Sequence, residues 1–260
     1  MRKLGFKLFS TNLQTAPALV KECAEFVATK KDMFMELMVI PDSSDDDFMK
    51  IKRQLGDVEV RIHAPYTNFD TGNKEAETQN RKLIAISQKI ADIFNSKTIV
   101  VHGGYGHGQK YIEETARQFK GFNDKRIVIE NIPYYGSEGE ALHGNTAAAI
   151  AYIMDKSGCG FCFDFSHAIC AALSLNMDIQ TQLKSLFELK PTVYHLCDGD
   201  INKADDLHLH LGDGNYPLKN FLRNYTDENA YITLETGHGV EQHIDLRIKD
   251  YEYIKSLSED

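Results

Sequence analysis

Histidines and carboxylates recur at the ends of short apolar runs between residues 63 and 235. Two such runs are Ile127-Val-Ile-Glu130 and Phe161-Cys-Phe-Asp164, where an unpaired carboxylate would be costly to bury. A shared cation is the simplest partner for so many acidic groups, and imidazole mixed with carboxylate favours zinc, with manganese or iron as alternatives. The candidate metal ligands are His63, His102, Glu130, Asp164, His167, His195, Asp206, His208 and Glu235.

The size of this set indicates how many ions it would hold. A catalytic zinc ion takes three or four protein ligands, whereas the set contains five histidines and four carboxylates. We therefore expect two or three ions. Metal ions about 3.5 to 4 Å apart suit hydrolytic displacement at phosphorus, because one generates hydroxide near neutral pH and the others hold the non-bridging and leaving oxygens.

Short runs rich in β-branched residues, Phe and Met alternate eight times with longer segments of helical period. This alternation is typical of a parallel sheet, and eight repeats predict an α/β fold, the (β/α)8 TIM barrel. Side chains at the carboxyl ends of its strands would converge on one mouth and bring the candidate ligands together there. The expected strands are residues 3–9, 33–40, 58–64, 98–102, 126–132, 160–165, 192–197 and 231–235.

The segments between the strands are expected to be helices. In residues 75–94, Leu83, Ile86, Ile90 and Ile93 recur at intervals of three and four and give one apolar stripe. No linker or change of composition divides the chain, so we expect residues 1–260 to form a single domain. The longest connections, 134–144 and 198–217, both follow strands, on the face where such barrels place their active sites.

The composition limits the classes of function. The 260 residues are 42% hydrophobic and 26% charged, with a formal net charge of −9 that opposes approach to a polyanion unless bound cations reverse the field locally. Lys7 interrupts the N-terminal apolar run too early for a signal peptide, and no stretch has membrane-spanning length. The five cysteines lack framework spacing. We therefore expect a cytoplasmic protein with no membrane partner.

The residues around the candidate ligands resemble endonuclease IV, also called AP endonuclease family 2, within the xylose isomerase-like TIM barrel superfamily. The resemblance spans the third to the eighth expected strand in the family's order, and all nine ligand positions have a counterpart. The motifs that carry it are His63-Ala-Pro-Tyr66, Val101-His102-Gly-Gly, Ile129-Glu130-Asn131, Asp164-Phe-Ser-His167-Ala, His195-Leu-Cys-Asp198, Asp206-Leu-His208, Leu211-Gly-Asp-Gly-Asn215 and Leu234-Glu235-Thr236.

The resemblance implies a trinuclear zinc centre that cuts DNA beside abasic sites, a reaction of DNA repair. A bridging water would be the nucleophile, the third ion would stabilise the leaving oxygen, and Tyr66 would lie at the substrate groove. The three ions would bind, in turn, to His63, His102 and Glu130; to Glu130, Asp164, His195 and Glu235; and to His167, Asp206 and His208.

Two loops differ from the family's pattern. After the second strand the family carries polar and basic residues that contact DNA, whereas this chain has Pro41-Asp-Ser-Ser-Asp-Asp-Asp47. After Glu130 a Gly-rich stretch of the family is replaced by Pro133-Tyr-Tyr-Gly136. Neither loop supplies an Arg or Lys to grip a phosphate, and phosphate contacts dominate the affinity of DNA-binding proteins. The acidic loops therefore disfavour abasic duplex DNA as the partner.

Sugar isomerases and epimerases of the same superfamily offer a second hypothesis. In this function Glu130 and Glu235 would exchange the substrate proton, the metal would polarise the sugar oxygens, and His167 would bind a hydroxyl. These enzymes hold one metal ion with Glu, Asp, His and Glu at strand ends, a set matched here by Glu130, Asp164, His195 and Glu235.

The surplus of ligands favours the multi-metal hydrolase, because an isomerase needs neither His102 nor the pair Asp206 and His208. A barrel that binds metal without catalysing a reaction is a third hypothesis. In both enzyme hypotheses the substrate is phosphorylated or sugar-like, and Glu130 and Glu235 are the candidate catalytic carboxylates.

The remaining polar residues are weighed as structural. Cys159 and Cys162 have redox-motif spacing but begin a buried apolar run, and we assign them no role. Asp198 and Lys203 follow the seventh strand without a pattern that favours substrate contact. The histidines expected to be solvated in or near polar loops are His107, His143, His210, His238 and His243.

Overall fold

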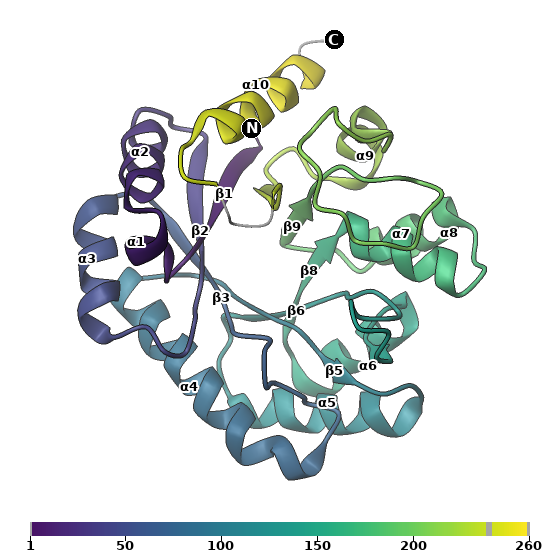
Figure 1. Ribbon diagram of the computed structural model, residues 1–260. Helices are drawn as coiled ribbons and strands as arrows, with labels where there is room; N and C mark the ends of the chain where they lie inside the picture. The colour runs from purple at the N-terminus through teal and green to yellow at the C-terminus, as the bar shows by residue number, and fades with distance from the viewer. Residues whose placement is uncertain (1, 238–240, 259–260) are drawn as a thin grey trace.

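The computed structural model describes residues 2–237 and 241–258. Within them, eight parallel strands close into a barrel in the order β1-β10-β9-β8-β6-β4-β3-β2, and the helices form a ring around it (Figure 1). This architecture confirms the predicted (β/α)8 fold. The barrel strands are β1 (Lys3–Phe9), β2 (Met33–Met38), β3 (Val60–His63), β4 (Ile99–Val101), β6 (Ile127–Glu130), β8 (Gly160–Asp164), β9 (Val193–Leu196) and β10 (Tyr231–Leu234).

Helices occupy the connections between consecutive barrel strands, and one more follows β10. The expected helix over residues 75–94 begins with a short 3-10 turn, η1 (Lys74–Ala76), and continues as α4 (Glu77–Phe94). No helix in the described ranges is long and apolar enough to cross a membrane. The others are α1 (Asn12–Thr15), α2 (Pro17–Ala28), α3 (Asp45–Leu55), α5 (Gln109–Phe122), α6 (Ala147–Ser157), α7 (Phe165–Ser174), α8 (Ile179–Phe187), α9 (Leu218–Tyr225) and α10 (Asp245–Ser258).

Most barrel strands end one to two residues earlier than the apolar pattern predicts. Val39 and Ala64 lie beyond the ends of β2 and β3, yet both are almost fully buried. Hydrophobicity reports burial rather than strand pairing, so the apolar run continues after the chain has left the ladder. As a result His102 and Glu235 lie one residue beyond β4 and β10 rather than at their last positions.

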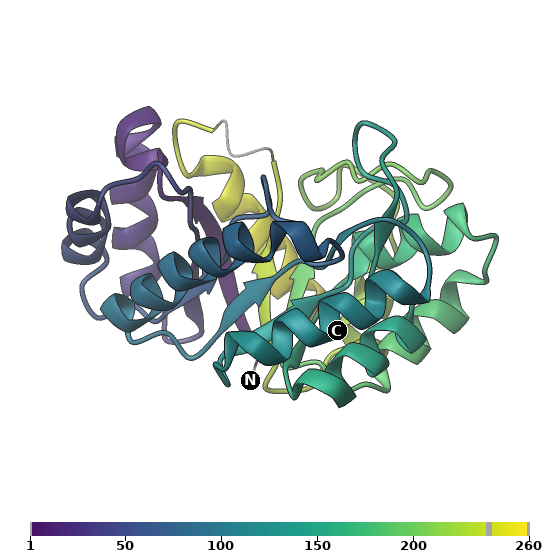
Figure 2. The same ribbon diagram turned by 90° about the horizontal axis from the view of Figure 1, so that it is seen from below.

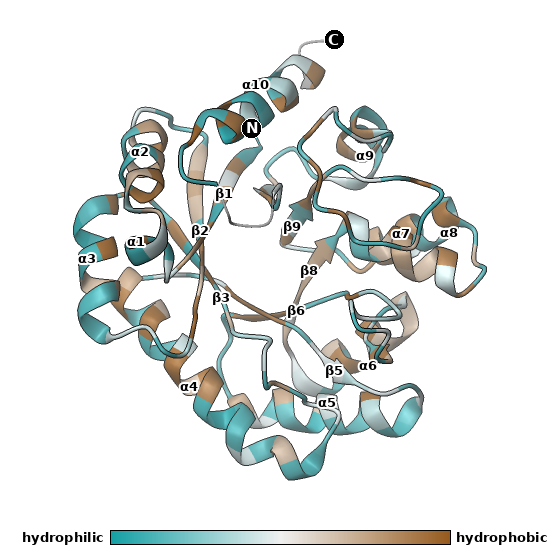
Figure 3. Ribbon diagram, in the orientation of Figure 1, coloured by the Kyte–Doolittle hydropathy of each residue, from teal (hydrophilic) through white to brown (hydrophobic). Residues whose placement is uncertain are grey.

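Side chains alternate along the strands between two environments, as the period of two requires. Odd-numbered β6 residues such as Ile127 and Ile129 pack in the large core between sheet and helices, whereas Val128 joins a small core inside the barrel. Figure 3 shows brown along strands such as β2 and β8, and helices such as α3 and α4 that carry both brown and teal stretches. The inward position after Val128 is Glu130, so the same alternation that builds the core points this carboxylate into the barrel mouth.

The amino-terminal end of the barrel is closed by packed side chains. Gly5 leaves room for the ring of Phe34, because a Cβ atom at Gly5 would lie 2.4 Å from it. The guanidinium of Arg61 stacks 3.6 Å from the ring centroid of Tyr231 and donates to the Thr98 hydroxyl. These contacts form a floor beneath the mouth.

The acidic segment after β2 builds the start of α3. Ser44 and Asp47 form a capping box, in which each side chain bonds to the other residue's backbone amide. Asp45 and Asp46 lie in the first turn, where carboxylates interact favourably with the helix dipole. The nearby Lys89 amine lies 2.5 Å from Asp45. The charges therefore have a structural explanation that does not involve a substrate.

A small second sheet lies over the carboxyl ends of the barrel strands. β5 (Gly104–Tyr105) pairs antiparallel with β7 (Leu142–His143), which joins the loop after β4 to the long loop after β6. In Figure 2 the loops near residues 135 and 205, coloured teal and light green, project from the same side of the molecule, opposite the N-terminus. The sequence pattern did not predict this sheet, because two-residue strands show no periodicity.

Candidate metal centre

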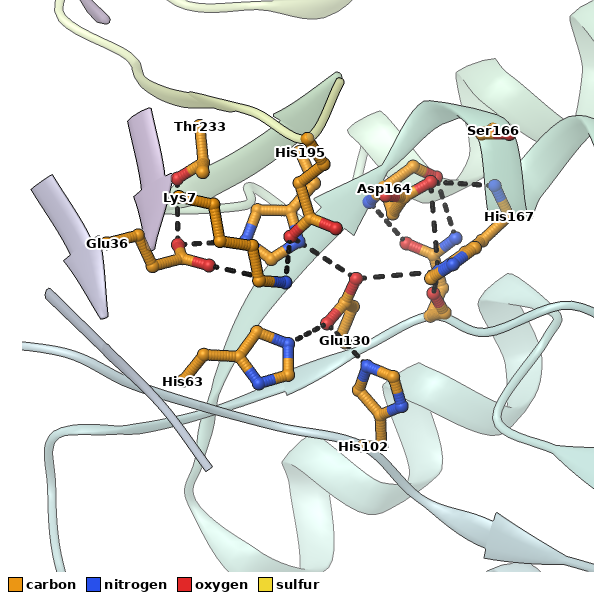
Figure 4. A network of polar contacts seen from close by, with 12 residues as sticks. Lys7, Glu36, His63, His102, Glu130, Asp164, Ser166, His167, His195 and Thr233 are labelled. Carbon is orange, nitrogen blue, oxygen red and sulfur yellow. Dashed lines mark hydrogen bonds and ion pairs between the residues drawn. The ribbon is translucent and has the colours of Figure 1, made fainter. Parts of the chain in front are cut away.

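Glu130, the last residue of β6, lies at the centre of the barrel mouth (Figure 4). Its Oε2 atom lies 3.2 Å from Nε2 of His63 and 3.0 Å from Nε2 of His102. Its Oε1 atom lies 2.9 Å from Nδ1 of His195. Because the parallel strands present their carboxyl ends together, one carboxylate faces imidazoles from three directions. The two oxygens can thus serve two different cations.

His195 has a carboxylate at each ring nitrogen. Nδ1 lies 2.7 Å from Oε1 of Glu235, and Nε2 lies 3.0 Å from Oε2 of Glu36 on β2. The Thr233 hydroxyl donates to the same Glu36 oxygen at 2.7 Å. A carboxylate behind a histidine ring fixes the tautomer of a metal-binding imidazole and increases its basicity. Glu36 therefore turns Nδ1 of His195 toward Glu130 and Glu235.

A second cluster lies beside the first, where the loop after β9 meets the start of α7. Nε2 of His167 lies 3.2 Å from Oδ2 of Asp206, and Nε2 of His208 lies 2.8 Å from the same oxygen. Ser166 donates to the other Asp206 oxygen at 2.6 Å. Nδ1 of His208 lies 2.6 Å from the backbone carbonyl oxygen of Glu235. With Nδ1–H donating there, Nε2 is the nitrogen that faces the cluster.

Asp164 connects the two clusters. It precedes α7, and its Oδ1 atom accepts a hydrogen bond from the backbone amide of His167 at 2.7 Å, which caps the helix. Burial raises the pKa of Asp164 to about 7 in spite of the neighbouring His167, and the negative charges of Glu130 and Asp206 add to this effect. The carboxylates are so close that they compete for ionisation, which bound cations would relieve.

Histidines supply the positive charge that balances the other carboxylates. Burial opposes ionisation of Glu130, but His195 and His102 outweigh it and hold its pKa well below the usual value. Burial likewise opposes protonation of His208, but Asp206 raises its pKa to about 9. Buried carboxylates and imidazoles in this mixture are the donors that zinc prefers. The donor chemistry therefore fits zinc.

The ligand atoms form overlapping groups within which all atoms lie within 4.8 Å of one another. Two of these groups match the expected first and third ion positions. The expected second set is divided among three groups in the described residues. Asp164 groups with Glu130 and His167, His195 and Glu235 group with Glu36 and His63, and Glu130 and His195 also group with Cys162. The first and third positions correspond to His63, His102 and Glu130, and to His167, Asp206 and His208.

Lys7, near the end of β1, reaches the carboxylates of Glu235 and Glu36. Its Nζ atom lies 2.5 Å from Oε1 of Glu235 and 3.7 Å from Oε1 of Glu36. Burial opposes the charge, but Glu235 and Glu36 more than compensate and raise the pKa of Lys7. Lys7 and Glu36 were not predicted as site residues. The signal that could have identified them is a charged residue in the interior of each of two apolar strands, at an inward-facing position.

A cavity of about 660 Å³ lies above the two clusters. Tyr66 stacks on His102 with ring centroids 5.2 Å apart and is 45% exposed, at the position expected for a substrate contact. Tyr105 and Tyr135, also exposed, line the same cavity. Arg247 lines it as well and donates to the backbone carbonyl of Lys7. The cavity thus combines a polar floor with an aromatic rim.

The nine predicted ligands all lie at the barrel mouth, whereas other polar residues have structural roles. Asp198 accepts hydrogen bonds from the backbone amides of Gly199, Gly212, Gly214 and Tyr216, which organise the loop after β9.

The expectation of solvated loop histidines is wrong for His143, which is buried and lies 2.6 Å from the Thr115 hydroxyl. His210 is also bound, at 2.8 Å from Asp250. His107 stacks on the ring of Tyr134. His238 lies outside the described residues.

Known proteins resemble this chain over most of its length. The probable endonuclease 4 of Mycobacterium leprae (strain Br4923) is 25% identical over 188 residues, which cover 68% of this chain and 73% of that protein. Endonuclease IV from Thermus thermophilus has the same fold, with a TM-score of 0.67 at 19% identity over 98% of this chain and 99% of that one. The TTHB071 protein from the same organism, soaked with ZnCl2, has a TM-score of 0.71 at 18% identity over 99% and 98%.

These similarities confirm the resemblance to endonuclease IV that the motifs indicate. The model of the family described as xylose isomerase-like TIM barrel matches residues 22–256. The chain therefore belongs to the xylose isomerase-like TIM barrel family.

Proposed function

We propose that the protein is a zinc-dependent phosphodiester hydrolase of the endonuclease IV type. The observation that carries this proposal is the second cluster, in which His167 and His208 face one oxygen of Asp206. An isomerase with a single metal ion has no need of this cluster. Its position beside the Glu130 cluster supports two or three ions that act on one substrate.

The residues would hold the ions in groups that share carboxylates. Glu130 would contribute one oxygen to the side of His63 and His102 and the other to the side of His195. A bound zinc ion supplies Lewis acidity for a phosphoryl oxygen and lowers the pKa of a nearby water. Manganese could replace zinc, since the set contains no thiolate donor.

The protein's own side chains would orient the substrate and hold protons. Glu235, which lines the cavity, and Glu130, which shares Nδ1 of His195 with it, are the carboxylates that would accept a proton. Tyr66 offers an exposed ring on which a sugar or base can stack. Lys7 and Arg247, the Lys and Arg side chains that line the cavity in the described part of the chain, come from β1 and α10 rather than from the loops where the family carries basic residues.

These cations bear on the substrate class. The acidic segment after β2 is occupied in starting α3, so it offers no grip for a DNA backbone. A cavity of about 660 Å³ accommodates a ligand of nucleotide or sugar-phosphate size. We therefore propose a phosphorylated, sugar-containing substrate, with the abasic site of a DNA strand as one example and extensive duplex contacts disfavoured.

A sugar or sugar-phosphate isomerase or epimerase is the second candidate function. It is favoured by the placement of Glu130 and Glu235 at one ring nitrogen of His195, at 2.9 and 2.7 Å. Two carboxylates that converge in this way could exchange a proton across a substrate carbon.

Two assays on the same zinc-loaded preparation separate these functions. The hydrolase proposal predicts incision of single-stranded and duplex oligonucleotides that carry an abasic site, or release of p-nitrophenol from a p-nitrophenyl phosphodiester. Either activity should be lost in His208→Ala. The isomerase proposal predicts exchange of a substrate proton with deuterated solvent for a ketose or its phosphate, and this exchange would persist in His208→Ala. Absence of phosphodiester cleavage together with such exchange would overturn the hydrolase proposal.

A further inference from the structure

We propose that the ammonium group of Lys7 occupies a cation position inside the metal centre and thereby excludes an additional divalent ion from Glu36 and Glu235. This inference rests on the proposed metal centre. It goes beyond it by assigning a role to a pair of residues, Lys7 and Glu36, that lies outside the nine expected ligands.

The position itself is defined by four buried side chains. Ligand atoms of Glu36, His63, His195 and Glu235 lie within 4.8 Å of one another, a geometry that could hold a metal ion. The Lys7 ammonium lies among them, 2.5 Å from Oε1 of Glu235 and 3.7 Å from Oε1 of Glu36. Figure 4 shows the Lys7 amine pointing into the space between Glu36 and Glu130. A positive charge is thus already present where an ion would bind.

Glu36 provides an independent sign that this position needs a cation. The side chain is fully buried, and its Oε2 atom is occupied by His195 and Thr233. Its Oε1 atom is also buried, yet it accepts no hydrogen bond from the residues that the structure describes. A buried carboxylate oxygen without a donor is costly, and at 3.7 Å Lys7 compensates it by charge rather than by a hydrogen bond.

Lys7 and Glu36 together also add no net charge to the metal centre. Glu36 orients His195 from behind, but it adds a negative charge beside four other carboxylates. Lys7 adds one positive charge, so the pair is neutral as a unit. The Glu36 carboxylate can therefore support the histidine without attracting a divalent ion to itself. Arg247 secures the arrangement, because its guanidinium donates to the backbone carbonyl of Lys7.

Lys3 provides a matched comparison on the same strand and the same inward face. It lies four residues earlier, at the barrel floor, and its amine is 2.7 Å from Glu59. Replacing Lys3 removes the same charge from β1 without changing the mouth. Lys7→Met and Lys3→Met are therefore the same chemical change at opposite ends of the barrel, with the Lys3 side chain the more exposed of the two, at 34% against 13%.

Counting zinc per chain tests this inference. The full-length wild type, Lys7→Met and Lys3→Met are saturated with zinc, freed of excess by gel filtration and analysed by elemental mass spectrometry. If the wild type retains a given number of ions, Lys7→Met should retain one more and Lys3→Met the same number. Adding Glu36→Gln to Lys7→Met should remove the extra ion. Lys7→Gln, which is neutral but polar, carries the same expectation if the methionine variant does not fold.

An unchanged count in a folded, neutral Lys7 variant would overturn the inference and leave the proposed function intact. A wild type that retains no zinc at all would overturn both. An extra ion that persists after Glu36→Gln would also overturn the inference, because the ion would then bind elsewhere.

Discussion

The two ends of the barrel both contain charged side chains, but these charges are balanced in different ways. At the floor two cations share one carboxylate and one aromatic ring: Glu59 lies 2.7 Å from Lys3 and 3.5 Å from Arg61, and both cations lie over the ring of Tyr231. At the mouth, carboxylates outnumber Lys and Arg, and the balance depends on histidines. The charges at the floor are therefore balanced by the protein's own side chains. At the mouth the compensating charge comes largely from buried histidines, and this demand for positive charge is the physical basis for proposing that the mouth binds metal ions.

The largest difference between the ends should appear when a central carboxylate is removed. We predict that Glu130→Gln lowers kcat/KM for a phosphodiester by more than about 100-fold, because losing even an outer partner of a metal ligand costs about 10–100-fold. Glu59→Gln, the same change at the floor, should remain within about twofold. Steady-state hydrolysis at saturating zinc measures both; equal losses would show that the mouth has no special role.

The residue behind His195 should have the next largest effect. Glu36→Gln is expected to weaken zinc binding by about 10–100-fold, because the histidine loses the carboxylate that fixes its tautomer. Competition against a fluorescent zinc chelator measures the affinity. Glu59→Gln is again the control. A Glu36→Gln affinity equal to that of the wild type would mean that His195 is not a zinc ligand.

The dependence of zinc affinity on pH should be of intermediate size. In the metal-free protein the pKa of His208 is raised to about 9, so the ring is protonated at pH 7 and must lose a proton to bind zinc. Asp164, with a pKa of about 7, is partly protonated there as well. His102, whose pKa is lowered by burial, contributes no proton.

Zinc affinity should therefore rise as pH increases from 7 toward 9 and fall below pH 7. Each released proton changes the affinity by about tenfold per pH unit. Titration calorimetry in buffers of different ionisation enthalpy counts the protons released. In His208→Ala this count should fall; an unchanged count would contradict the assignment of His208.

The smallest effect is expected at the rim of the cavity. Tyr66→Ala should raise KM by about fivefold, equivalent to about 1 kcal/mol of lost stacking, with kcat little changed. Tyr66→Phe, which keeps the ring, should match the wild type. The same kinetic assay measures both. A drop in kcat in Tyr66→Phe would indicate that the hydroxyl, rather than the ring, contacts the reacting group.

The sequence predicts the ligands that end the strands better than the charged residues within the strands, for a physical reason. A carboxylate at the end of an apolar strand, such as Glu130, is recognisable because burial without a partner is unfavourable. Lys7 and Glu36 obey the same principle, but each lies within its strand rather than at its end, and their pairing depends on how β1 and β2 align. That alignment, with Lys7 beside Glu36, is a property of the closed barrel.

Loop structure is predictable only in part. The capping role of Ser44 and Asp47 follows a local sequence pattern, whereas the burial of His143 depends on a small sheet between two distant loops. Asp198 follows a strand, as the candidate ligands do, yet it binds backbone amides instead of facing the cavity. A residue's place at the end of a strand therefore indicates at which end of the barrel it lies but not what it binds.

The number of zinc ions retained per chain tests the central claim most directly. Protein purified without chelator and analysed for metal should contain two or three zinc or manganese ions, and His102→Ala and His208→Ala should each lower the number. A single ion that remains unchanged in both variants would contradict the account.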